Sequence, residues 1–134
     1  MSETGGIVAG AVVTMGATHY TVDIRAGKHK FVADEPPGGG GSDAGPSPFG
    51  LLLSSLGACT AITLRMYCER KQWPLGEIEV QLTYRWHGET PAVERTLTLG
   101  GLDETQRARC AEIAEKTPVT RALKRGVTIH TVVR

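Results

Sequence analysis

The residues of this chain best suited to redox or nucleophilic chemistry are its three cysteines, Cys59, Cys68 and Cys110. A cysteine attacks as the thiolate, and an ordinary thiol, with a pKa near ~8.5, needs a nearby cation to ionise at neutral pH. The three cysteines show no CxxC or other short ligand spacing and the histidines are scattered, so no metal site is expected. On pattern alone, Cys59 is either a small core residue or a reactive thiol.

A long apolar helix is predicted around Cys59, in the stretch "SSLGACTAITLRMYCERK" at residues 54–71. Ser47 followed by Pro48 is a favourable start, and Pro74 stops the helix at about residue 72. Its first four turns are apolar nearly all round, which predicts a helix enclosed on most sides. Cys59 lies about a dozen residues inside, beyond useful reach of the helix dipole, so a reactive thiolate at this position would require a cation from elsewhere.

The other two cysteines have less reactive interpretations. Cys110 shares an apolar helical stripe with Ile113 and Ala114, which is typical of a buried free cysteine acting as a small hydrophobic residue. Cys68 follows Cys59 by nine residues, which at ~100° per residue places the two side chains on opposite sides of the helix. Because Cys68 lies in the polar end of its helix beside Glu69, we expect it to be partly exposed and uninvolved.

The remaining elements indicate an α+β fold with antiparallel sheets rather than a doubly wound parallel sheet. Glycines and prolines at 36–48 predict a loop, which lacks the flanking features of phosphate-binding loops. Asp103 is the expected cap of a second helix. The predicted strands span 7–15, 20–25, 30–35, 75–86, 92–99 and 126–133, and the predicted shorter helices span 104–116 and 119–124.

Composition sets further limits. A chain of 134 residues suits one domain, residues 1–134, and a formal charge of +1 argues against nucleic acid or an anionic membrane as a partner. Glu3 occupies a region where a secretory signal carries basic residues, and the apolar run at 51–64 is shorter than the ~20 residues of a spanning helix. We therefore expect a cytoplasmic protein without a cofactor.

Two segments resemble the osmotically inducible protein C and organic hydroperoxide resistance (OsmC/Ohr) family. "GGSDAGPSPFGLLLSSLGACTAITLRMYCERK" is similar to that family's glycine-rich loop leading into a helix of the form P-x-x-L-L-x-x-x-L-G-x-C. "EKTPVTRALKRGVTIHTVV" is similar to its closing segment, CPV-x-x-x-L-x-x-x-V-x-I-x-T. The resemblance covers residues 20–133, approximately.

This resemblance implies an OsmC-like α+β fold, with antiparallel sheets around a long central hydrophobic helix, in which two chains interlock as a homodimer. It also implies reduction of organic hydroperoxides by a peroxidatic thiolate at the position of Cys59, with active sites at the dimer interface. An arginine from the N-terminal strands would stabilise the thiolate and the leaving alkoxide. Arg25 is the match, with Arg121 and Arg65 as alternatives, and an exposed hairpin charge is the other interpretation of Arg25.

The sequence departs from the hydroperoxide reductases of this family at two positions. Phe49 follows Pro48 where those enzymes have a glutamate, and none of the nearby carboxylates, Asp34, Glu35 and Asp43, stands at the motif position. Thr117 replaces the resolving cysteine of the "CP" motif, and Cys110 does not occupy the same place.

Two functions follow from these departures. The first is a one-cysteine peroxidase in which an external thiol or dithiol recycles Cys59. The second is a non-catalytic homodimer that binds a small apolar or acyl ligand at the interface, with Cys59 as a vestige or a covalent handle. Phe49 and Thr117 favour the second function, and the retention of Cys59 in a Gly-Ala context favours the first.

Overall fold

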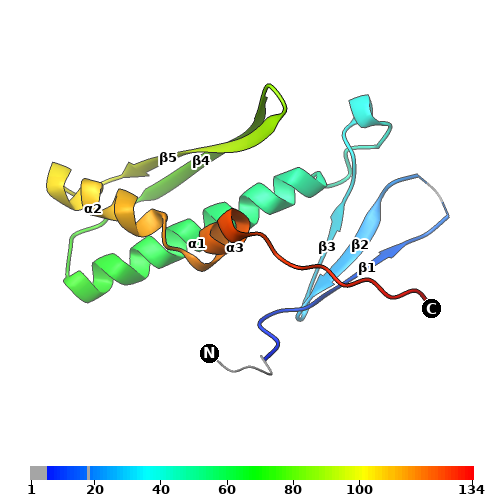
Figure 1. Cartoon of the computed structure of the whole chain (residues 1–134), viewed down its shortest axis with the longest axis horizontal. Helices are drawn as coiled ribbons and strands as arrows, with labels where there is room; N and C mark the ends of the chain where they lie inside the picture. Colours follow the sequence, from blue (N-terminus) through cyan, green and yellow to red (C-terminus); the bar gives the residue numbers. More distant parts are fainter. Residues whose placement is uncertain (1–5, 18) are drawn as a thin grey trace. The chain divides into compact units, whose positions relative to one another are not determined.

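The computed structural model describes residues 6–17 and 19–134, so that Glu3 lies outside the described residues. The chain divides into two compact units, Met1–Leu51 and Leu52–Arg134 (Figure 1). Both sheets are antiparallel and one helix is much longer than the others, which confirms the α+β class. One domain over residues 1–134 stays a prediction.

The first unit contains a three-stranded sheet in the order β1-β2-β3, formed by Ala11–Met15, Val22–Ala26 and His29–Ala33. A tight turn connects β2 and β3, with Gly27 at a φ of 60°, a backbone conformation that glycine adopts at little cost. Arg25 on β2 is opposite Val12 on one side and Lys30 on the other. The three N-terminal strands are thus confirmed, with shorter bounds.

Asp34 anchors the glycine-rich loop that follows β3. Its side chain is buried and accepts hydrogen bonds from the Thr21 hydroxyl and from the backbone N–H groups of Glu35, Ser42 and Ala44. Burial raises the pKa of Asp34, but these hydrogen bonds together outweigh it and leave that pKa below its usual value. The carboxylate is therefore ionised at neutral pH and fixes the loop, which includes one short 3-10 turn, Pro37–Gly39.

Helix α1, Pro48–Lys71, begins and ends close to the predicted positions. The Ser47 hydroxyl accepts a hydrogen bond from the backbone N–H of Gly50 at 3.1 Å, as expected of a cap. The helix stops before Gln72, whose φ of 58° is left-handed.

The burial of α1 differs from the prediction. In the single chain one stripe is buried, formed by Leu56, Thr60, Leu64 and Cys68, whereas Ile62 and Met66 are 55% and 58% exposed. A single chain therefore encloses only one side of α1, and not most sides as predicted. By length and apolar composition alone α1 could also cross a membrane, a test that core helices of soluble proteins pass as well.

A long hairpin, β4 (Ile78–His87) and β5 (Thr90–Leu99), lies along α1 in the second unit (Figure 1). Gly57 of α1 faces this hairpin, because a Cβ at that position would lie only 2.9 Å from the Leu82 Cδ1 atom. The absence of a side chain at Gly57 thus allows the helix and the strand to approach each other closely.

The core of the second unit lies where the C-terminal part of α1 meets β5 and helix α2, Glu104–Ala114. Asp103 caps α2 and forms a capping box with Gln106, as the sequence predicts for the cap. The buried core residues are Leu64, Cys68, Leu75, Leu99, Leu102 and Cys110. The expectation that Cys68 is partly exposed is wrong, because β5, α2 and their connection cover it and leave 1% of the residue exposed.

The chain ends with helix α3, Pro118–Arg125, and an extended tail. The predicted strand at 126–133 is absent from the described chain, in which no other strand pairs with this segment. Its apolar side chains are exposed, with Val127 at 69%, Ile129 at 83% and Val132 at 92%. A strand needs a neighbouring strand for its backbone hydrogen bonds. The tail has the sequence pattern of a strand, but the described chain supplies no such neighbour.

Candidate active site

Cys59 lies near the middle of α1 and is half-buried. The next residue, Thr60, is completely buried, and its hydroxyl donates a hydrogen bond to the Leu56 carbonyl at 2.7 Å. Cys59 therefore stands at the margin of the buried stripe, next to a residue whose side chain is held fixed.

Arg95 of β5 connects Thr60 with the C-terminal helices. Its Nη1 donates hydrogen bonds of 3.0 Å to the hydroxyls of Thr60 and Thr120, and its Nη2 donates bonds of 3.1 Å to the Ala114 carbonyl and a Glu115 carboxylate oxygen. Only 12% of this side chain is exposed. The guanidinium thus fixes α1, the end of α2 and the start of α3 to one strand.

Sequence reasoning did not identify Arg95, although a signal for it existed. Arg95 occupies the same alternating positions of its strand as Val93, Leu97 and Leu99, and it therefore belongs to the apolar face. A charged residue on the apolar side of a strand implies buried partners, because an unpaired buried charge is costly. Which partners these are depends on helices far away in the sequence.

Glu115 neutralises part of this buried charge. It pairs with Lys124 as well as Arg95. The hydrogen bond with Lys124 lowers the pKa of Glu115, against the opposite effect of burial, and the charges of Lys124 and Arg95 lower it further. The three side chains together carry a net charge of +1.

Thr117, which the family resemblance sets at the position of a resolving cysteine, belongs to the same network. It is completely buried, and its hydroxyl accepts a hydrogen bond from the Thr120 backbone N–H, capping α3. The two threonine hydroxyls also share a hydrogen bond of 2.7 Å. The structure thus links Thr117 to Thr60, the neighbour of Cys59, through Thr120 and Arg95.

The three arginines considered from sequence occupy different surroundings. Arg65 donates hydrogen bonds to the carbonyls of Leu75 and Gly76, so its guanidinium holds the connection after α1. Arg121 is exposed on α3. Arg25 is exposed on β2, in the first unit, whereas Cys59 belongs to the second, and its role at the thiol stays a prediction.

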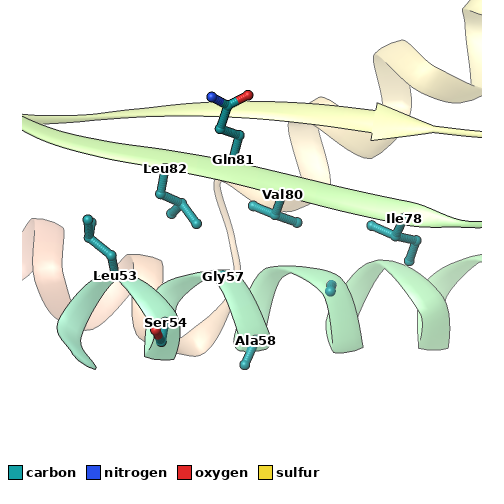
Figure 2. A pocket seen from close by; sticks show the side chains of 9 residues that line it. Leu53, Ser54, Gly57, Ala58, Ile78, Val80, Gln81 and Leu82 are labelled. Atoms are coloured by element: carbon teal, nitrogen blue, oxygen red, sulfur yellow. The ribbon is translucent and has the colours of Figure 1, made fainter. Parts of the chain in front are cut away.

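An open apolar groove of about 530 Å³ runs between α1 and β4. Figure 2 shows Leu53 pointing from the helix, and Leu82, Val80 and Ile78 from the strand, into the space between the two elements. Cys59 does not line this groove. Within residues 6–17 and 19–134, no group of three or more His, Cys, Asp or Glu side chains is placed to hold a metal ion.

Comparison with known proteins identifies the family. The model of the family described as OsmC-like protein matches residues 39–132, more than half of the chain. The chain belongs to the OsmC-like protein family. No curated protein matches the sequence.

Solved structures of OsmC-like proteins share the fold. A putative osmotic stress induced and detoxification response protein from Psychrobacter arcticus matches with a TM-score of 0.73 and 17% identity over 88% of both chains. The organic hydroperoxide resistance protein OsmC from Legionella pneumophila matches with a TM-score of 0.69 and 16% identity, over 88% of this chain and 90% of that chain. OhrB of Bacillus subtilis, an organic hydroperoxide resistance protein, matches with a TM-score of 0.63 and 19% identity, over 88% of this chain and 91% of that chain. At these identities the likeness concerns the fold alone.

Proposed function

We propose that this OsmC-like protein reduces organic hydroperoxides with Cys59 as its single peroxidatic thiol. The observation that carries the proposal is the family match over residues 39–132, which includes Cys59, combined with the half-buried position of that thiol on α1. The names of the Legionella and Bacillus structures, organic hydroperoxide resistance proteins, support the substrate class.

The proposed reaction has two stages. The Cys59 thiolate attacks the terminal oxygen of the hydroperoxide, the O–O bond breaks, and the alkoxide takes up a proton to leave as an alcohol. The resulting sulfenic acid is attacked by an external thiol, which releases water and forms a mixed disulfide. A second external thiol then releases the Cys59 thiolate and carries away the disulfide.

An external reductant is part of the proposal because the chain offers Cys59 no matched second thiol. Thr117 has a hydroxyl, which cannot form a disulfide, and that hydroxyl is occupied as a helix cap. The other two sulfurs, those of Cys68 and Cys110, face each other in the core. Cytoplasmic localisation, where small thiols are abundant, and function without a cofactor belong to the same proposal.

The oxidation state of Cys59 tests this scheme. After one equivalent of cumene hydroperoxide, the mass of the chain should rise by one oxygen, and peptide mapping should place a dimedone adduct on Cys59. Excess peroxide should drive Cys59 to the sulfinic and sulfonic acids, because no second thiol traps the sulfenic acid. A disulfide between Cys59 and either other cysteine, or an unreacted Cys59, contradicts the scheme.

Arg25 is the proposed cation that stabilises the Cys59 thiolate and the leaving alkoxide. Arg25→Met should lower the rate of hydroperoxide reduction by about 10- to 100-fold and shift its pH dependence towards higher pH, because the thiolate forms less readily. Lys30→Met is the matched control, since Lys30 is the cross-strand neighbour of Arg25. Equal losses of rate in the two variants would show that Arg25 acts only as one of the surface charges of the hairpin and not at the thiol.

A homodimer is the proposed assembly, because a single chain leaves the apolar side chains Ile62 and Met66 of α1 exposed. Sedimentation at micromolar concentration should therefore give a dimer. Met66→Lys should raise the dissociation constant by at least about tenfold, since it places a charge in an apolar interface. Ala108→Lys, on the exposed side of α2, is the control. A folded wild-type monomer at these concentrations would exclude the dimer.

The second candidate function is binding of a small apolar or acyl ligand without catalysis. The groove between α1 and β4 favours it, because four aliphatic side chains point into it while Cys59 lies elsewhere (Figure 2). Unchanged Cys59 after peroxide treatment, combined with saturable binding of a fatty acid, would select this function.

A further inference from the structure

Two of the three cysteines form a buried pair away from Cys59. Cys68, in the last turn of α1, and Cys110, in α2, have their sulfur atoms 3.7 Å apart. Cys68 is 1% exposed and Cys110 is fully buried. The pair lies in the core among Leu64, Leu75, Leu99 and Leu102.

We propose that Cys68 and Cys110 form a reversible disulfide under prolonged exposure to hydroperoxide, and that this bond fixes α2 to α1. The site is separate from the proposed peroxidatic thiol and does not depend on it. It assigns a redox modification to two residues that the proposed function leaves unused.

The geometry favours bond formation between these two residues. A disulfide requires sulfurs about 2.05 Å apart, so each needs to move by less than about 1 Å if both share the approach. Their 3.7 Å separation is already that of atoms in contact.

The reaction balances with a hydroperoxide as the oxidant. One thiolate of the pair attacks the terminal oxygen, the O–O bond breaks, and the alkoxide leaves as an alcohol after taking up a proton. The second sulfur attacks the sulfenic sulfur, the S–O bond breaks, and the hydroxide leaves as water with the second thiol's proton. Two electrons thus pass from the two sulfurs to the peroxide.

The surroundings make this reaction slow. Burial, together with the hydrogen bond to Cys68, raises the pKa of Cys110 to about 11, so its thiolate is scarce at neutral pH. The oxidant also has to enter the core, which requires local opening of α2. The same enclosure protects the disulfide from reductants once it has formed. The pair therefore responds to sustained oxidation and not to each turnover at Cys59.

The bond has a large expected effect on stability. The cross-link closes a segment of the chain that contains the whole β4–β5 hairpin, and disulfides that close long segments restrict the unfolded chain most. For a chain of this length we expect the melting temperature to rise by about 5–10 °C.

The test uses the full-length Cys59→Ser variant, in which the buried pair holds the remaining thiols. After prolonged incubation with excess cumene hydroperoxide, the protein is denatured, alkylated and mapped. We expect a mass lower by two hydrogens, a linked Cys68–Cys110 peptide, two fewer alkylation sites and the higher melting temperature. Dithiothreitol under denaturing conditions should reverse all four.

Cys59→Ser/Cys110→Ala is the matched control and should show neither the linked peptide nor the higher melting temperature. The proposal is overturned if both sulfurs of Cys59→Ser remain alkylatable, if oxygen adds to each of them separately, or if the cross-link joins two chains. Should Cys59→Ser fail to fold, wild-type protein treated with diamide, which oxidises thiol pairs directly, gives the same readout. These outcomes are independent of hydroperoxide reduction at Cys59, which is measured on the wild type.

Discussion

Replacement of Cys59 by serine is expected to lower the rate of organic hydroperoxide reduction by at least about 100-fold. Serine preserves the size of the side chain, but its hydroxyl does not ionise near neutral pH and is not oxidised by peroxide. The rate is measured as loss of cumene hydroperoxide in the presence of dithiothreitol. This is the largest effect that the proposed function predicts.

The control for this experiment is Cys110→Ala, which removes a buried thiol and leaves Cys59 in place. It should retain hydroperoxide reduction, with some loss of stability because the substitution alters the core. Equal rates in the wild type and Cys59→Ser would remove Cys59 from the reaction. Equal losses in both variants would show that the assay reports folding and not chemistry.

The second large effect concerns stability. Arg95→Met should lower the free energy of unfolding by about 3 kcal/mol, because it removes the hydrogen bonds that a largely buried guanidinium donates to the Thr60 and Thr120 hydroxyls and to the Ala114 carbonyl. The ion pair with Glu115 contributes little of this, since Glu115 is 53% exposed. Urea unfolding at fixed protein concentration measures the change.

Arg85→Met is the matched control, because Arg85 pairs with Glu94 on the exposed side of the same hairpin. It should change the free energy of unfolding by less than about 0.5 kcal/mol. A similar loss in both arginine variants would contradict the structural role of Arg95.

The stabilisation that Glu115 contributes depends on pH. Folding lowers the pKa of Glu115, so this stabilisation is present above the unfolded pKa and is lost as the pH falls through the folded pKa.

Local signals in the sequence predicted most of the elements correctly. Ser47 with Pro48 and Asp103 each mark a helix start that the structure confirms, because capping depends on residues only a few positions apart. The turns at Gly27 and Gly88 also depend on local sequence, because glycine readily adopts the positive φ that each of them has. The start at Ser47 and Pro48, the apolar run and the stop at Pro74 predicted a long helix around Cys59, which is where the structure has it.

Contacts between distant segments explain the errors. Cys68 lies in a polar stretch of sequence, and its burial depends on Leu99 and Leu102, which follow about thirty residues later. The partners of Arg95 come from α1, α2 and α3, so no local pattern could identify them. The tail at 126–133 has the alternation of a strand, but alternation does not supply the neighbouring strand that pairing requires.

The capping role of Thr117 affects how this site can change in evolution. A single substitution to cysteine would supply the sulfur that two-cysteine relatives are implied to have, but it would cost about 1 kcal/mol of helix capping, because a thiol is a weak acceptor. It would also disturb Thr120, which receives a hydrogen bond from Arg95. The gain of a second cysteine at this position is therefore not a neutral step. Under the proposed function, this cost favours keeping the threonine and, with it, recycling by external thiols.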